Sequence, residues 1–152
     1  PQLLLAKAVD TEIISVYQAR IPYDCTLPKH LCQKLSNEFT LVQIKNNNDW
    51  SDFRRIIQLP RIPENINLKT GMLVGIIAYV GETTSENWPV FIESARVESG
   101  VGHLLISFVP GVYYPLQTDG YLDLSFVPGL QKVQLIQINH RFFVIESVEN
   151  SD

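Results

Sequence analysis

The fold is decided by two similar stretches, which read His-Leu-Leu-Ile-Ser-Phe-Val-Pro-Gly at 103–111 and Tyr-Leu-Asp-Leu-Ser-Phe-Val-Pro-Gly at 121–129. In both stretches the second, fourth and sixth residues are apolar, and alternate residues of a β-strand share one face. The Pro-Gly pair that ends each stretch stops strand pairing and turns the chain. We therefore predict two similar strands with matching inward faces.

Similar patterns continue on both sides of these two stretches, from Lys69 to the C-terminus. Apolar, β-branched segments alternate with Gly, Pro and Asn turn signals, and no intervening segment has room for a crossover helix. The sequence therefore predicts a mainly β protein, either an antiparallel β-sandwich or a barrel. The strands that we expect in this half are 72–80, 89–98, 103–109, 121–127, 133–138 and 141–148.

The N-terminal part differs in its patterning. We expect one domain over 1–152, in which a helix-containing part (1–68) precedes an all-β part (69–150). Within the first part, β-branched and aromatic residues predict strands at 11–19 and 40–45.

One or two short helices are expected in the same part. Leu27, Leu31 and Leu35 recur every four residues after a plausible N-cap, which predicts an amphipathic helix over 27–38. The segment 50–59 fits either a helix or the return strand of a hairpin, and we favour the helix.

A hairpin is predicted near the C-terminus, with its turn at Asn139-His140. In that register Ile136 lies opposite Phe143 and Leu135 lies opposite Val144. Both faces of the hairpin are then apolar, so each face must be covered by the rest of the fold or by a partner molecule.

Composition narrows the classes of partner. The 152 residues are 45% hydrophobic and 18% charged, with a formal net charge of −4. This excludes a disordered chain, and the lack of a basic excess argues against a general nucleic-acid coat or an anionic-membrane binder.

The sequence contains no pattern typical of a membrane-spanning segment, a signal peptide or a cysteine motif. The longest apolar run, Met72 to Val80, is too short to span a bilayer, and the first residues lack the pattern of a signal peptide. The two cysteines, Cys25 and Cys32, match neither a disulfide framework nor a CxxC metal motif. We expect a soluble protein of the cytoplasm or another reducing intracellular compartment, without membrane association.

No catalytic motif is present, whether P-loop, GxGxxG, HExxH, GxSxG or EF-hand. His30 and Cys32 could in principle form a nucleophile pair, but two residues apart on a helix they point in different directions. His103 and His140 have no partner at metal-ligand spacing. We therefore predict no catalytic residue, no metal site and no cofactor, and an enzyme is not favoured.

One acidic residue, Asp123, interrupts an apolar strand. Asp123 shares a strand face with Tyr121, Ser125 and Val127, which we interpret as the solvent face of the strand. The alternative is a perturbed acid in a barrel mouth near Tyr113, as part of a small-ligand or enzyme site.

The leading functional hypothesis is a non-catalytic protein-interaction or assembly module, a subunit of an oligomer or of a larger complex such as a particle shell. Its binding residues would be the loop aromatics Trp88, Tyr113 and Tyr114, because Trp and Tyr are enriched at binding hot spots. The Phe-Val-Pro-Gly strand ends resemble turns of jelly-roll coat proteins, and this resemblance covers only those few residues.

A nucleic-acid-binding barrel is the alternative. Arg54, Arg55 and Arg61 form the best basic patch, and Trp50 and Phe53 are interleaved with it. Such a patch could bind single-stranded nucleic acid by charge and stacking, in a fold of the OB type.

Overall fold

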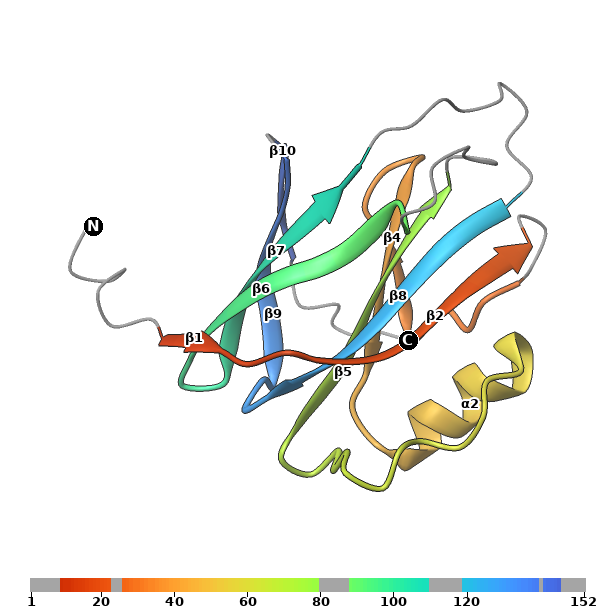
Figure 1. Cartoon of the computed structure of the whole chain (residues 1–152), viewed down its shortest axis with the longest axis horizontal. Helices are drawn as coiled ribbons and strands as arrows, with labels where there is room; N and C mark the ends of the chain where they lie inside the picture. The colour runs from red at the N-terminus through yellow and green to blue at the C-terminus, as the bar shows by residue number, and fades with distance from the viewer. Residues whose placement is uncertain (1–8, 23–25, 80–87, 110–118, 140, 146–152) are drawn as a thin grey trace.

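The computed structural model describes residues 9–22, 26–79, 88–109, 119–139 and 141–145. Two five-stranded sheets stack face to face, and a single helix of the described part lies on the outer side of one of them (Figure 1). The predicted mainly β class is confirmed, in its sandwich form, since the two sheets do not close into a barrel.

The first sheet, sheet A, has the strand order β1-β6-β7-β9-β10. Its pairs are antiparallel except for β7 with β9, which run parallel. That parallel pair distinguishes sheet A from the antiparallel sheets of a jelly roll. The strands are β1 (Val9–Thr11), β6 (Val90–Glu98), β7 (Val101–Phe108), β9 (Lys132–Ile138) and β10 (Arg141–Val144).

The second sheet, sheet B, has the order β2-β8-β5-β4-β3 and is antiparallel throughout. Two of its inner strands, β5 and β8, are buried on both faces, and β5 accordingly has a nearly continuous apolar sequence. The strands are β2 (Ile14–Pro22), β3 (Cys32–Lys34), β4 (Phe39–Ile44), β5 (Gly71–Tyr79) and β8 (Asp119–Pro128).

The helix α2 (Asn47–Ile57) confirms the helical interpretation of the ambiguous segment. Its N-cap is Asn46, whose side-chain oxygen accepts the N–H of Asp49 at 2.8 Å. The carboxylate of Asp49 in turn accepts the N–H of Lys45, so local polar contacts fix where the helix begins. Trp50 and Phe53 are buried against sheet B, which anchors the helix to the sandwich.

Sheet B therefore borders two separate hydrophobic cores. The first core lies between the sheets and the second lies between sheet B and α2 with the segment that follows it. Alternate residues of β5 and β8 enter opposite cores, as the period of a strand requires. Thus Val74 and Ile76 belong to the first core, whereas Leu73 and Ile77 belong to the second.

The predicted helix over 27–38 is wrong. Residues 32–34 form β3, an edge strand paired with β4, and Leu31 and Leu35 enter different cores. The side chain of Ser36 accepts the N–H groups of Glu38 and Phe39, which closes a tight turn in place of a helical one. Pairing with β4 thus overrides the four-residue leucine spacing.

The other predicted strands are confirmed, with boundaries that differ by a few residues. The segment 11–19 divides into the end of β1 and most of β2. The last strand, β10, ends at Val144, and residues 146–148 of the predicted strand lie outside the described residues. In the described part of the chain, no helix is both long enough and apolar enough to cross a membrane.

Candidate functional site

The outer face of sheet A is left uncovered by the described residues. On sheet B the corresponding outer face is covered by α2 together with Leu59 and Ile66. On sheet A the outward-facing residues of the β9–β10 hairpin remain open, and Phe142 and Val144 are 61% and 72% exposed. These two are the most exposed large apolar side chains in the described residues.

The hairpin itself forms in the predicted register, with Ile136 opposite Phe143 and Leu135 opposite Val144. Its inner face packs into the core between the sheets, where Ile136 is fully buried. Its outer face is the one that has no cover within the fold as described. The predicted need for a cover on both faces is therefore met on one face only.

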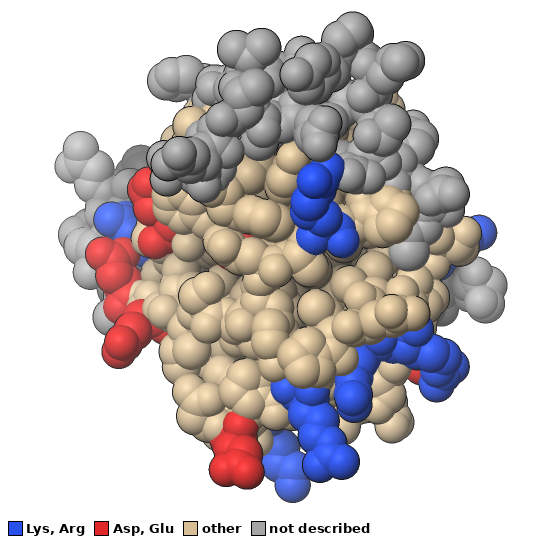
Figure 2. All heavy atoms as spheres, turned by 45° about the vertical axis from the view of Figure 1, so that its right-hand side comes forward, with Lys and Arg blue, Asp and Glu red and all other residues tan. Residues whose placement is uncertain are grey.

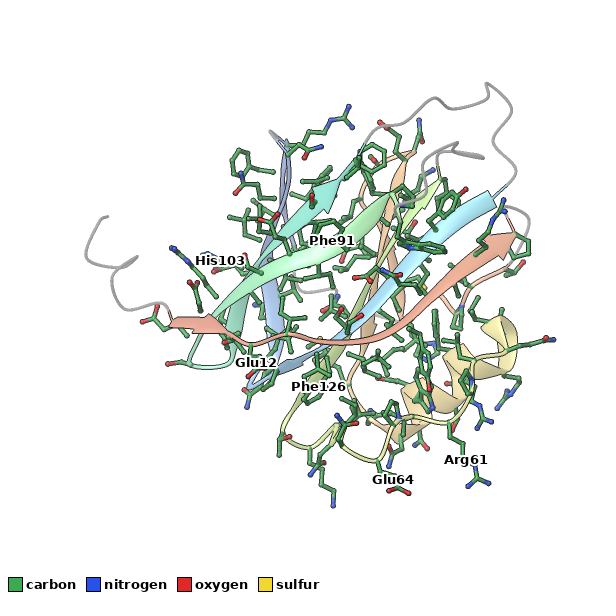
Figure 3. The ribbon with its side chains drawn as sticks, viewed as in Figure 1. Glu12, Arg61, Glu64, Phe91, His103 and Phe126 are labelled. Carbon is green, nitrogen blue, oxygen red and sulfur yellow. The ribbon has the colours of Figure 1, made fainter. Side chains whose placement is uncertain are left out.

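A polar hollow lies at the opposite side of the sandwich, beside β2, and has a volume of about 490 Å³. Its floor is formed by Asp123 and Ser125 of β8, which are only 2% and 1% exposed. Gln18 of β2 stands at the rim. Figure 3 places Glu12 at the passage from β1 to β2 and Phe91 on β6, and both residues border the hollow.

Asp123 connects the two sheets. Its Oδ2 accepts the N–H of Ile92 in sheet A at 3.0 Å and the hydroxyl of Ser125 at 3.4 Å. Its Oδ1 accepts Nε2 of Gln18 at 3.1 Å. Burial raises the pKa of Asp123 above its usual range, although the hydrogen bonds from Ile92, Gln18 and Ser125 act in the opposite direction.

The prediction of a solvent face around Asp123 is wrong. Tyr121 and Val127 of the same face lie in the core between the sheets, whereas Leu122 and Leu124 pack toward α2. The inward faces of β7 and β8 therefore enter different cores, despite their similar sequences. Because β8 is covered on both sides, its sequence alone does not distinguish one covered face from the other.

Bulges border the hollow on two strands. The register shifts at Val16 in the β2–β8 pair and at Glu93 in the β6–β7 pair. A bulge bends its strand and re-aims neighbouring side chains. In β6, the N–H of Ile92 next to the bulge is directed to Asp123.

Of the predicted binding aromatics, the structure describes Trp88, while Tyr113 and Tyr114 lie outside the described residues. The ring of Trp88 meets Tyr121 edge to face at 5.1 Å, and its Nε1 donates to the carbonyl of Leu122 at 3.2 Å. Arg20 lies over the other ring of this pair, 5.4 Å from the centre of Tyr121. Trp88 is thus partly buried, and its described contacts join the start of β6 to β8.

The arginines of the nucleic-acid alternative lie on and after α2. Figure 2 shows Lys and Arg gathered along the lower edge of this side of the molecule. Arg54 donates to the carbonyl of Leu59, and Arg55 lies 3.8 Å from Asp52. The expected stacking partners Trp50 and Phe53 are 5% and 0% exposed, so they are not accessible to nucleotide bases.

The histidine and cysteine candidates lie at and just before the start of β3, not on a helix. His30 instead directs its Nε2 to Asp52 on α2, at 3.2 Å. Cys32 lies on β3 and packs at the margin of the core under α2. Among the residues that the structure describes, no three His, Cys, Asp or Glu side chains are placed to hold a metal ion.

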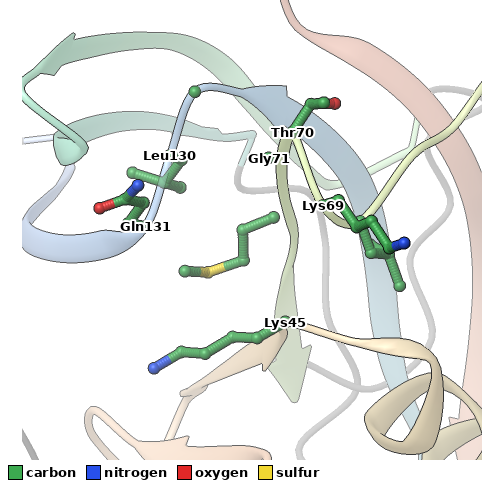
Figure 4. Close-up of a pocket in the computed structure, with 9 residues that line it drawn as sticks. Lys45, Lys69, Thr70, Gly71, Leu130 and Gln131 are labelled. Atoms are coloured by element: carbon green, nitrogen blue, oxygen red, sulfur yellow. The ribbon is translucent and has the colours of Figure 1, made fainter.

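A second cavity, of about 340 Å³, lies beside the start of β5 (Figure 4). Lys45 and Lys69 border it, together with Thr70 and Gln131. In the close-up the two lysine side chains run in opposite directions, so they do not converge on one anion.

Comparisons with protein-family models, with curated proteins and with solved structures find no match to this chain.

Proposed function

We propose that the chain is a non-catalytic assembly module that associates with a second copy of itself through β10. One observation carries this proposal: the outer face of sheet A is uncovered in the described residues, and its most exposed apolar side chains, Phe142 and Val144, lie on the edge strand. Exposed apolar patches mark interaction surfaces. An edge strand also presents backbone groups that a second strand can pair with.

The direction of the backbone groups supports pairing at this edge. The N–H of Ile145 donates to the carbonyl of Gln134 on β9 at 2.8 Å. Because backbone groups alternate in direction along a strand, those of Phe142 and Val144 point away from β9. Two residues of β10 thus present an N–H and a carbonyl each to the open edge.

This edge is complementary to itself. If a two-fold axis passes beside Phe143, Phe142 of one copy lies opposite Val144 of the other, and the reverse also holds. Both pairs place apolar side chains across the new strand pair, on the uncovered face. The two copies of sheet A would then form one continuous sheet, and the exposed area of both apolar side chains would decrease.

The experiment measures molar mass by light scattering over a series of protein concentrations. The wild type is expected to approach twice the 17.3 kDa of one chain as concentration rises. Phe142→Lys and Val144→Lys are each expected to keep the mass of one chain, since both place a charge at the new contact. Ile56→Lys is the matched control, because Ile56 is an exposed apolar residue on α2, away from β10.

Two results would contradict self-association through β10. One is a wild-type protein that keeps the mass of a single chain at the highest concentration. The other is a dimer whose formation is unchanged in both lysine variants of β10. Circular dichroism of each variant separates a lost contact from a lost fold.

A further inference from the structure

The edge strand β2 has an open side that the self-association of β10 does not use. It spans nine residues, whereas the other edge strands β1, β3 and β10 span three or four. Figure 1 shows β2 along the margin of sheet B, and no described strand pairs with its outer side. A long open edge is a template for an added strand.

Sheet A leaves part of β2 uncovered on the side between the sheets. The short β1 pairs with β6 only from Ala95 to Val97. Ser15 and Gln18 of β2 face toward sheet A, in register with Ser125 and Asp123, and yet both are exposed. The polar hollow of about 490 Å³ occupies this place, and its size is typical of a site for a small molecule or a side chain.

The charge of the hollow selects its occupant. Its border contains three carboxyl groups, from Glu12, Glu93 and Asp123, and no Lys or Arg among the described residues. Arg20 lies further along β2, over the ring of Tyr121, and does not border the hollow. A basic side chain complements this border, and an acidic one would meet repulsion.

We infer that β2 binds an extended peptide that adds as a further strand of sheet B and carries a Lys or Arg opposite Gln18. In a paired strand, the residue opposite Gln18 lies on the same face as Gln18, which is the face toward the hollow. Its long side chain reaches over Asp123, between Glu12 and Glu93. The backbone pairing supplies affinity, and the hollow supplies the preference for a basic residue.

The test uses fluorescence polarisation with labelled synthetic peptides as long as β2, built from alternating Thr and Val with one central Lys. The same peptide with a central Glu is the charge control. A third peptide carries the central Lys and N-methyl groups on the backbone amides of one edge. A fourth peptide carries the central Lys and N-methyl groups on the amides of the opposite edge. We expect the Lys peptide to bind, the Glu peptide not to bind, and methylation of one edge only to abolish binding.

The variant of the protein is Glu93→Gln, which removes an exposed charge from the border of the hollow. It is expected to weaken binding of the Lys peptide by about twofold to fivefold, as expected for a solvent-accessible ion pair. Glu98→Gln, at an exposed position on the same strand that does not border the hollow, is the matched control and is expected to bind as the wild type does.

Three results would overturn the inference. These are no binding of the Lys peptide, equal binding of the Lys and Glu peptides, and equal binding of the unmethylated Lys peptide and both of its methylated forms. Since Phe142→Lys leaves β2 unchanged, the same titration on that variant separates a failure of peptide binding from a failure of self-association.

Discussion

At the residue scale, Asp123 of sheet B is joined to sheet A by a buried hydrogen bond from the N–H of Ile92. A buried carboxyl is costly unless hydrogen bonds satisfy it, and here Ile92, Gln18 and Ser125 all donate to it. One of these donors belongs to the opposite sheet, so the acid fixes the separation and register of the sheets beside the hollow. Asp123 therefore both joins the two sheets and forms part of the polar floor of the hollow.

The first prediction concerns Asp123→Asn. Because burial raises the pKa of Asp123, the folded protein binds a proton more tightly at this residue than the unfolded chain does. The stability that this tighter proton binding contributes is fully present below 3.8, the pKa of Asp123 in the unfolded chain. It is lost as the pH rises through the higher pKa of Asp123 in the folded protein. Asparagine carries no charge, so the stability of the variant relative to wild type should increase from acidic to neutral pH. Urea unfolding across that pH range measures the difference.

Asp123→Ala is the companion variant. It leaves the buried N–H of Ile92 without its acceptor, which should cost about 1–3 kcal/mol at every pH. Asparagine keeps an acceptor for Ile92, and its amide can pair with the side-chain amide of Gln18 after that group turns over. Equal pH profiles for wild type and Asp123→Asn would show that the carboxyl titrates alike in both states.

At the element scale, the start of α2 is determined by local hydrogen bonds at its N-cap. Asn46→Ala should destabilise the protein by about 1 kcal/mol, because the N–H of Asp49 loses its cap. The matched control is Asn47→Ala, one residue later and exposed in the first turn, where alanine is the better helix former. Denaturant midpoints compare the two variants, and an equal loss in both would contradict the assigned cap.

The same scale shows why other elements were harder to predict. The hairpin register follows from two short apolar strands around one turn, so local information suffices for β9 and β10. The segment 27–38 has an equally regular leucine pattern, but its conformation is set by pairing with β4, and such long-range pairing is absent from the local sequence. The predicted solvent face of β8 is wrong because both of its faces are covered, one by α2 and one by sheet A.

The candidate site depends even more on long-range contacts. Asp123 is visible in the sequence as an acid within an apolar strand, but its donors Gln18 and Ile92 are 105 and 31 residues away. No spacing rule connects them. The uncovered outer face of sheet A, by contrast, is indicated by the sequence, because the β9–β10 hairpin is apolar on both faces.

At the scale of the whole molecule, the two cores share β5 and β8, and this sharing should make unfolding cooperative. The two tryptophans of the sequence report on different sides: Trp50 lies in the core under α2, and Trp88 packs on the core between the sheets. We expect the fluorescence of Trp88→Phe, which retains Trp50, and that of Trp50→Phe, which retains Trp88, to change at the same urea concentration as the circular dichroism of each variant. We expect the two cores to unfold together because β5 and β8 contribute side chains to both, so displacement of either strand disrupts both cores. The opposite result would be a fluorescence change at a lower urea concentration than the circular dichroism change in Trp88→Phe, the variant that retains Trp50. It would show that α2 detaches while the two sheets remain folded.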